Sequence, residues 1–192
     1  DLEEMKSFEP PHVSAYCLTL PEKHPMNSGR CSELEQVTMF EMVSHHLGEI
    51  GLKRYEISNF SKPGFESRHN NLYWTDKNYW ALGLSAHSYK KEPDWGYRFW
   101  NPSSYDAYMK SIKDLRTAKR IEDSFGSENF EKLEIHESLT DYCHTHLRLE
   151  EGIDLQSVRQ KFGRSLTELT KSRLEKLVDR KWLENIGEKW TL

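Results

Sequence analysis

The side chains with the greatest chemical potential in this chain lie within residues 54–89, RYEISNFSKPGFESRHNNLYWTDKNYWALGLSAHSY. His69 and His87 each carry an imidazole, which can donate or accept a hydrogen bond or bind a metal near neutral pH. Tyr73 and Trp74 follow His69 closely and offer large, flat apolar rings. Residue types alone leave two interpretations open, a binding site or an aromatic-rich loop that closes over the edge of a core.

The composition is that of a folded globular protein. Of the 192 residues, 36% are hydrophobic, 30% charged and 12% aromatic, which is too aromatic for a disordered chain and too polar for a membrane protein. No apolar run approaches the roughly 20 residues that span a bilayer, and the formal net charge of −4 comes without a sustained basic run. We therefore expect a cytoplasmic protein that has no transmembrane segment and binds no nucleic acid.

The N-terminal elements predict an α/β fold that presents His69 at the end of a strand. Alternating apolar residues predict a strand at 12–20, a capped apolar periodicity predicts a helix at 32–51 with one buried face, and a second strand follows at 54–57. Strand, helix and strand in succession predict a right-handed parallel crossover. The loop with His69 leaves the carboxyl end of the second strand, where ligands bind in such folds. A small apolar run at 81–85 predicts a further buried strand.

The composition becomes polar and turn-rich around residue 91, so we expect one domain at 1–91 and another at 92–192. The second domain is predicted to be mostly helical, with helices at 101–117, 127–147, 152–163 and 165–180, Asn101 and Pro102 opening the first, and a final hairpin that turns at Gly187-Glu188. Helix, helix and hairpin in this order resemble a winged helix. The helix that would meet DNA mixes acidic with basic residues, which favours a structural wing and leaves a partner-binding module as one alternative function.

Several segments resemble the oxygen-independent coproporphyrinogen III oxidase-like radical S-adenosylmethionine proteins. The resemblance lies in HVSAYCLTL near the start, in YEISNFSKPGFESRHNNLYW and ALGLSAHSY of the central stretch, and in LRLEEGIDLQSVRQKFG near the end. It covers nearly the whole chain. The run His69-Asn70-Asn71-Leu72-Tyr73-Trp74 fits the pattern HNxxYW, which is typical of the haem chaperone branch of this family, the HemW-like proteins.

The resemblance implies a fold, a ligand and a set of site residues. The fold would be the terminal part of a partial (β/α) radical S-adenosylmethionine barrel, followed by a mostly helical, winged-helix-like C-terminal domain. The haem-binding residues would be His69, which would bind the haem iron, with Asn70, Tyr73 and Trp74 around it and Arg68 paired to a propionate. Cys17 and His87 match positions that line the S-adenosylmethionine pocket in the oxidase branch. The partners would be haem or a porphyrin and the haem-acceptor proteins.

One departure from the family pattern concerns the mechanism. The family holds a [4Fe-4S] cluster on a CxxxCxxC motif, whereas Cys17, Cys31 and Cys143 lie far apart in this chain. The resemblance therefore implies that the cluster and S-adenosylmethionine belong to an intact, longer protein, and that this C-terminal half is inactive alone. The alternative to a haem carrier is an oxygen-independent coproporphyrinogen III oxidase, which converts two propionates to vinyl groups. The sequence fixes neither the oligomeric state nor the role of His87, although an unpaired sheet edge predicts self-association.

Overall fold

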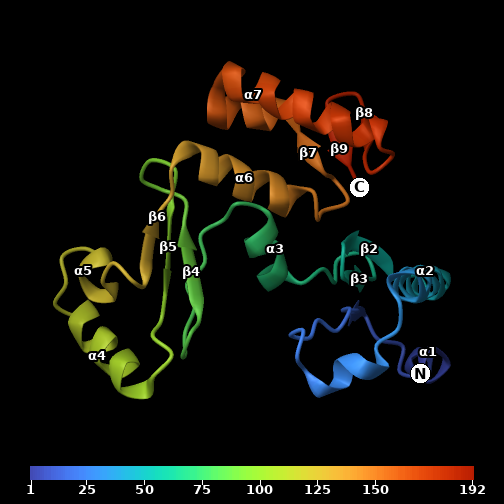
Figure 1. Cartoon of the computed structure of the whole chain (residues 1–192), viewed down its shortest axis with the longest axis horizontal. Helices are drawn as coiled ribbons and strands as arrows, with labels where there is room; N and C mark the ends of the chain where they lie inside the picture. Colours follow the sequence, from blue (N-terminus) through green and yellow to red (C-terminus); the bar gives the residue numbers. More distant parts are fainter. The chain divides into compact units, whose positions relative to one another are not determined.

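The computed structural model describes residues 1–192, except for the side chain of Glu122. The chain divides into two compact units, unit 1 (Asp1–Arg68) and unit 2 (His69–Leu192), and each is described by itself. Both units contain helices and strands, so the predicted α/β class is confirmed (Figure 1). The domain boundary predicted after residue 91 is not tested by this division and stays a prediction. Within the described part of the chain, no helix is long and apolar enough to cross a membrane.

Unit 1 combines one long helix with a small sheet. Its elements are α1 (Leu2–Lys6), β1 (His12–Ser14), the 3-10 helix η1 (Pro25–Gly29), α2 (Glu33–Glu49), β2 (Lys53–Glu56) and β3 (Asn59–Ser61). Its buried core consists of Leu47, Leu52 and Phe60, each at most 1% exposed. Burying a side chain of this size stabilises the fold by roughly 1.5–3 kcal/mol. The last turns of α2 are therefore the part of the helix that holds this unit together.

The predicted parallel relation of the two strands around α2 is present, although the strands are not neighbours. β1 and β2 flank α2 in sequence, and β3 lies between them and is antiparallel to both, so β1 and β2 run parallel to each other. The predicted strand at 12–20 is too long. β1 ends at Ser14, which pairs with Asn59, the first residue of β3, so β3 offers no strand partner further along. Beyond this point Tyr16 and Leu18 are exposed.

The helix α2 lies where the sequence predicts it, because its N-terminal signal is strong. Ser32 and Glu35 form a capping box: the Ser32 hydroxyl accepts a hydrogen bond from the Glu35 N–H at 3.3 Å, and the Glu35 carboxylate accepts one from the Ser32 N–H at 2.7 Å. The predicted buried face is only partly present. Leu34 and Val37 in the first turns are 76% and 53% exposed.

Unit 2 carries two further sheets and the longer helices. Its elements are α3 (Arg68–Trp74, which begins at the last residue of unit 1), β4 (His87–Lys90), β5 (Tyr97–Trp100), α4 (Tyr105–Leu115), α5 (Glu122–Phe125), β6 (Phe130–Lys132), α6 (Ile135–His146), β7 (Ile153–Asp154), α7 (Leu155–Asp179), β8 (Glu184–Ile186) and β9 (Lys189–Thr191). The sheets are antiparallel, in the orders β4-β5-β6 and β7-β9-β8.

Each sheet of unit 2 has its own core. Phe99 on β5 packs against Phe125 of α5, with ring centroids 4.9 Å apart. The larger core joins α6, α7 and the third sheet, and it consists of Leu139, Tyr142, Ile153, Leu155, Val158, Phe162, Leu174, Leu183 and Trp190. Gly152 enters this sheet at φ +67, and a Cβ there would lie 2.1 Å from the Trp190 carbonyl oxygen. Only glycine fits at this point.

The segment 81–85, predicted to be a buried strand, is a loop. Gly83 adopts φ +98, and the Asn101 side-chain amide donates hydrogen bonds to the carbonyl oxygens of Ala81 (3.3 Å) and Gly83 (2.8 Å). Because Asn101 is engaged with this loop, it does not cap the next helix as predicted. Ser104 caps α4 instead, accepting a hydrogen bond from the Ala107 N–H.

The C-terminal predictions are partly right. The helix predicted at 127–147 begins only at Ile135, because the residues before it form β6 and pair with β5. The two helices predicted on either side of Gly163 are present but run on as α7, which non-helical backbone at Gly163 (φ +81) interrupts. The final hairpin, β8 and β9 around residues 187–188, is confirmed.

Candidate functional site

The HNxxYW motif lies on the short helix α3 and not on a loop as predicted. A turn with Gly64 at φ +85 precedes the helix, and the Tyr55 hydroxyl accepts a hydrogen bond from the Ser67 N–H at 3.2 Å, directly before α3 begins. Residues four apart on a helix share one face. The spacing of the motif therefore brings the side chains of His69 and Tyr73 together.

His69 and Tyr73 form a hydrogen-bonded pair. The His69 Nε2 and the Tyr73 hydroxyl are 3.0 Å apart, and the two rings meet edge to face with centroids 5.0 Å apart. His69 is exposed, whereas Tyr73 is half-buried. An exposed imidazole on a fixed helix is able to bind a ligand or a metal from solution. An incoming metal that uses Nε2 has to displace the Tyr73 hydroxyl, because both need the same nitrogen.

Aromatic and cationic neighbours surround the rest of the motif within unit 2. The Arg148 guanidinium, just after α6, lies 4.3 Å from the ring centroid of Trp74, a cation–π distance. Tyr79 packs edge-on against Tyr73, with centroids 4.5 Å apart. Burial, followed by the neighbouring Tyr73, raises the pKa of Tyr79 above its ordinary value, so its hydroxyl stays protonated. The indole Nε1 of Trp74 is buried and finds no hydrogen-bond partner among the described residues.

The remaining residues predicted for haem binding lie on the same helix. Arg68 is exposed at the start of α3, and Asn70 is half-buried. Arg68 belongs to unit 1 and the other motif residues to unit 2. The helix thus keeps all five predicted residues, Arg68, His69, Asn70, Tyr73 and Trp74, within two turns, and their role in binding haem stays a prediction.

Cys17 and His87, predicted for the S-adenosylmethionine pocket, fall in different units. Cys17 is exposed after β1 and lines an apolar groove of about 390 Å³ together with Tyr16, Met26 and Phe40. His87 is exposed on β4, where its ring stacks on Trp100 with centroids 5.4 Å apart. A stacked pair of rings on a sheet surface gives His87 a packing role that residue type alone did not reveal.

The cysteines do not suit an iron–sulfur cluster. Cluster ligands are thiolates, and burial raises the pKa of Cys143 to about 11, which favours the thiol. Cys17 and Cys31 are in unit 1 and Cys143 is in unit 2. Among the residues that the structure describes, no group of three or more His, Cys, Asp or Glu side chains could hold a metal ion.

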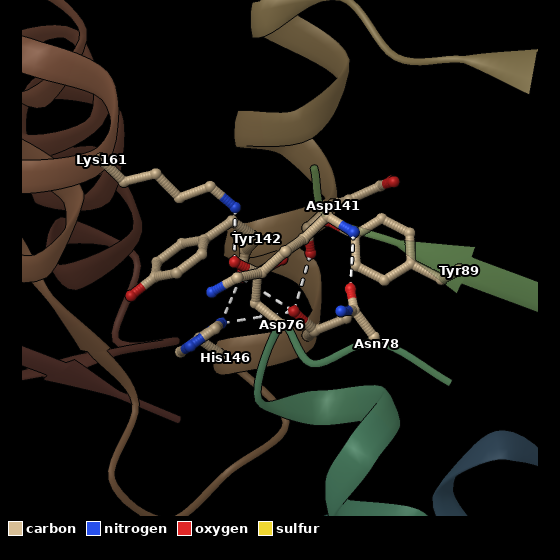
Figure 2. Close-up of polar contacts among 9 residues, drawn as sticks. Asp76, Asn78, Tyr89, Asp141, Tyr142, His146 and Lys161 are labelled. Carbon is tan, nitrogen blue, oxygen red and sulfur yellow. Dashed lines mark hydrogen bonds and ion pairs between the residues drawn. The ribbon is translucent and has the colours of Figure 1, made fainter. Parts of the chain in front are cut away.

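A network of charged and aromatic residues next to α3 has no counterpart in the sequence prediction. Asp76, two residues beyond α3, contacts Lys161 and Tyr89, and the side chains of Asp141, Tyr142 and His146 lie around them (Figure 2). These residues are far apart in sequence and carry no local motif. The density of aromatic residues within 54–89 was the only available signal, and that stretch includes Asp76 and Tyr89 but not the other four residues.

Two curated relatives match nearly the whole chain. The heme chaperone HemW of Lactococcus lactis is 32% identical over 193 residues, which cover 96% of this chain and 47% of that protein. The heme chaperone HemW of Bacillus subtilis is 28% identical over 186 residues, which cover 93% and 46%. The chain thus spans about half the length of these relatives. The resemblance to HemW-like proteins that HNxxYW predicts is confirmed.

A family model and a solved structure agree with this result. Residues 145–192 match the model of the HemN C-terminal domain. The structure of coproporphyrinogen III oxidase (HemN) from Escherichia coli, described as a radical SAM enzyme, superposes with a TM-score of 0.66 over 98% of this chain and 45% of that one. The sequence identity is 12%, so this similarity shows a shared fold and nothing about activity.

Proposed function

We propose that this chain, a HemW-like C-terminal portion, serves in a haem chaperone that binds haem and delivers it to haem-requiring proteins. The observation that carries the proposal is the near full-length match to relatives named heme chaperone, together with an exposed histidine at the head of the motif helix. The proposal names the acceptor proteins only as a class, the haem-requiring proteins. The proposal includes the cytoplasmic location expected from the sequence.

In this proposal each of the predicted residues on α3 makes a different contact with haem. The His69 imidazole serves as an axial ligand of the iron, since haem iron accepts a neutral imidazole nitrogen. Tyr73 contacts the His69 ring, Trp74 lies next to Tyr73, and both offer apolar rings to the porphyrin. Arg68 is exposed at the same end of the helix and pairs with a propionate, and Asn70 lies next to the ligand.

The finer fold and the other cofactors belong to the same proposal. The similarity in fold to a radical SAM enzyme supports the proposal that residues 1–91 are the end of a partial barrel and that residues 92–192 form a winged-helix-like domain. S-adenosylmethionine and a [4Fe-4S] cluster would act in the intact protein. The cysteines of this chain do not fit the cluster, so we assign no reaction step to it.

The alternative, an oxygen-independent coproporphyrinogen III oxidase, has weaker support. Its favourable observation is the shared fold, at 12% identity, whereas the curated relatives with 28–33% identity are named heme chaperone. A shared fold accommodates many activities. We therefore place the carrier function first.

A haem titration tests the proposal. We expect the wild-type chain to bind ferric haem saturably and to shift the Soret band, and His69→Ala to weaken this binding by about tenfold or more, the scale on which loss of a principal contact acts. His87→Ala is the matched control, because it removes an exposed histidine of unit 2 outside α3. Equal binding by wild type and His69→Ala contradicts the role of His69 as the axial ligand, and no binding at all contradicts the assignment of this chain as the haem-binding part.

A further inference from the structure

Asp76 joins three elements of unit 2 at the end of the motif helix. The Tyr89 hydroxyl, on β4, donates a hydrogen bond to Asp76 Oδ1 at 2.8 Å, and the Lys161 ammonium, on α7, donates to Oδ2 at 2.5 Å. Figure 2 shows these side chains meeting from separate parts of the unit. Both carboxylate oxygens are thus engaged, each by a different element.

The surroundings strengthen this ion pair. The side chains of Asp76 and Lys161 are only 17% and 25% exposed, so solvent screens their attraction less than at an open surface. The Lys161 ammonium also lies 5.2 Å from the ring centroid of Phe162 and 5.7 Å from that of Tyr142. Burial, followed by the hydrogen bond to Asp76, raises the pKa of Tyr89 far above its ordinary value, so its hydroxyl remains a donor.

The backbone connects Asp76 directly to the motif. The residue before it, Thr75, donates its N–H to the Asn71 carbonyl at 3.1 Å, and its hydroxyl donates to the same oxygen at 2.5 Å. Helical hydrogen bonding therefore continues up to the residue that precedes Asp76. Asp76 thus directly follows the helical turn that carries Tyr73 and Trp74.

We propose that Asp76 is a positioning residue for the His69–Tyr73 pair, which it holds in place by tying the end of α3 to Lys161 and Tyr89. The inference rests on the proposed function, in which this pair meets haem. A fixed helix end presents the imidazole and its aromatic neighbours in one arrangement, so that haem binding does not have to order them. Through Lys161, α7 thereby influences the site on α3.

The test compares Asp76→Asn and Lys161→Gln with wild type, by haem titration and by the ring ¹⁵N resonances of His69 without haem. Asparagine keeps an oxygen for Tyr89 but loses the charge that holds Lys161. We expect Asp76→Asn to shift the His69 resonances and to weaken haem binding by about tenfold, the scale of such indirect coupling. In the double variant two neutral amides face each other, so we expect it to lose less than the sum of the single changes.

Asp154→Ala is the matched control for loss of stability. Asp154 caps the N-terminus of α7 by accepting hydrogen bonds from the Gln156 and Ser157 N–H groups, and the side-chain hydrogen bonds described for it lie within residues 154–157. Its loss should destabilise unit 2 while leaving the His69 resonances and haem affinity unchanged. Folded Asp76→Asn with unchanged resonances and affinity overturns the inference. If the wild-type chain binds no haem, the proposed function fails, and the His69 resonances still decide whether Asp76 positions the pair.

Discussion

The His69 imidazole makes a hydrogen bond to Tyr73 that its proposed role requires it to break. Tyr73 lies on the same helix face, and its hydroxyl is 3.0 Å from Nε2 of His69. Iron and hydroxyl compete for one nitrogen, because Nε2 cannot bind iron while it accepts the Tyr73 proton or donates its own. At the scale of single residues, Tyr73 is therefore both a neighbour of haem and a competitor of its iron.

Replacing Tyr73 by phenylalanine separates these roles. The ring and its packing against Tyr79 remain, while the hydrogen bond to His69 is lost. We expect Tyr73→Phe to bind ferric haem roughly threefold to tenfold more tightly, because a single hydrogen bond contributes about 0.5–1.5 kcal/mol. Soret titrations of wild type, Tyr73→Phe and His69→Ala measure this. Weaker binding by Tyr73→Phe would instead mean that the hydroxyl orients the imidazole for iron.

At the scale of single residues, the HNxxYW motif was predictable from the sequence. The charged residues that approach it from distant parts of the chain were not. His69 and Tyr73 are four residues apart, so a helix alone brings them together. Arg148 and Lys161 approach the motif through tertiary packing, and nothing in their local sequence marks them. Long-range contacts of single charged side chains leave no periodic pattern in the sequence. The sequence therefore predicted only the part of the candidate site that lies within the motif itself.

The last turn of α6 forms a separate pH-sensitive element. His146 stacks on Tyr142 with ring centroids 3.7 Å apart, and its Nδ1 lies 2.8 Å from the Tyr142 carbonyl oxygen. Burial, more than the nearby Lys161, lowers the pKa of His146 below its ordinary value, while the Tyr142 carbonyl and Asp76 act in the opposite direction. The neutral imidazole therefore belongs to the folded state.

Acid should consequently destabilise unit 2 through this helix. The unfolded chain binds the His146 proton more readily than the folded one, so the stabilisation is present above the unfolded pKa near 6.5 and is lost as pH falls toward the lowered folded value. We expect the free energy of unfolding to drop by up to about 1.4 kcal/mol per pH unit in that window, and the drop to be smaller in His146→Phe.

Urea unfolding followed by tryptophan fluorescence at several pH values measures this effect. Every tryptophan of the chain lies after residue 69, so the signal reports on unit 2 alone. His45→Phe, which changes an exposed histidine of unit 1, is the control and should leave the pH dependence unchanged. Identical pH profiles for wild type and His146→Phe would contradict the assignment.

Helices were better predicted than strands because their signals are local. The capping box at Ser32 and Glu35 and the turn of the final hairpin are encoded by neighbouring residues, and both are present. Strand pairing depends on which distant segment lies alongside. Thus residues 130–132, which were predicted to be helical, form β6 and pair with β5, and β3, which was not predicted, lies between β1 and β2.

At the scale of the whole molecule, unit 1 exposes several large apolar side chains around one groove. The groove beside β1 is lined by large side chains that remain open to solvent, among them Leu18 (62% exposed), Met26 (61%) and Met39 (48%). The strands β1 and β2 also form the two edges of their sheet. Exposed apolar patches and open strand edges promote association with another chain.

We therefore expect the chain to self-associate through unit 1. Sedimentation equilibrium should give an average mass above the 22.8 kDa of one chain, and the double variant L18E/M39E should raise the dissociation constant by about tenfold or more, since each buried apolar side chain contributes roughly 1.5–3 kcal/mol. Ile186→Glu is the control, because Ile186 is an equally apolar side chain, 69% exposed, in unit 2. A wild-type chain that sediments as a monomer at all concentrations, or an Ile186→Glu variant that dissociates as readily as the double variant, would show that the groove does not drive association.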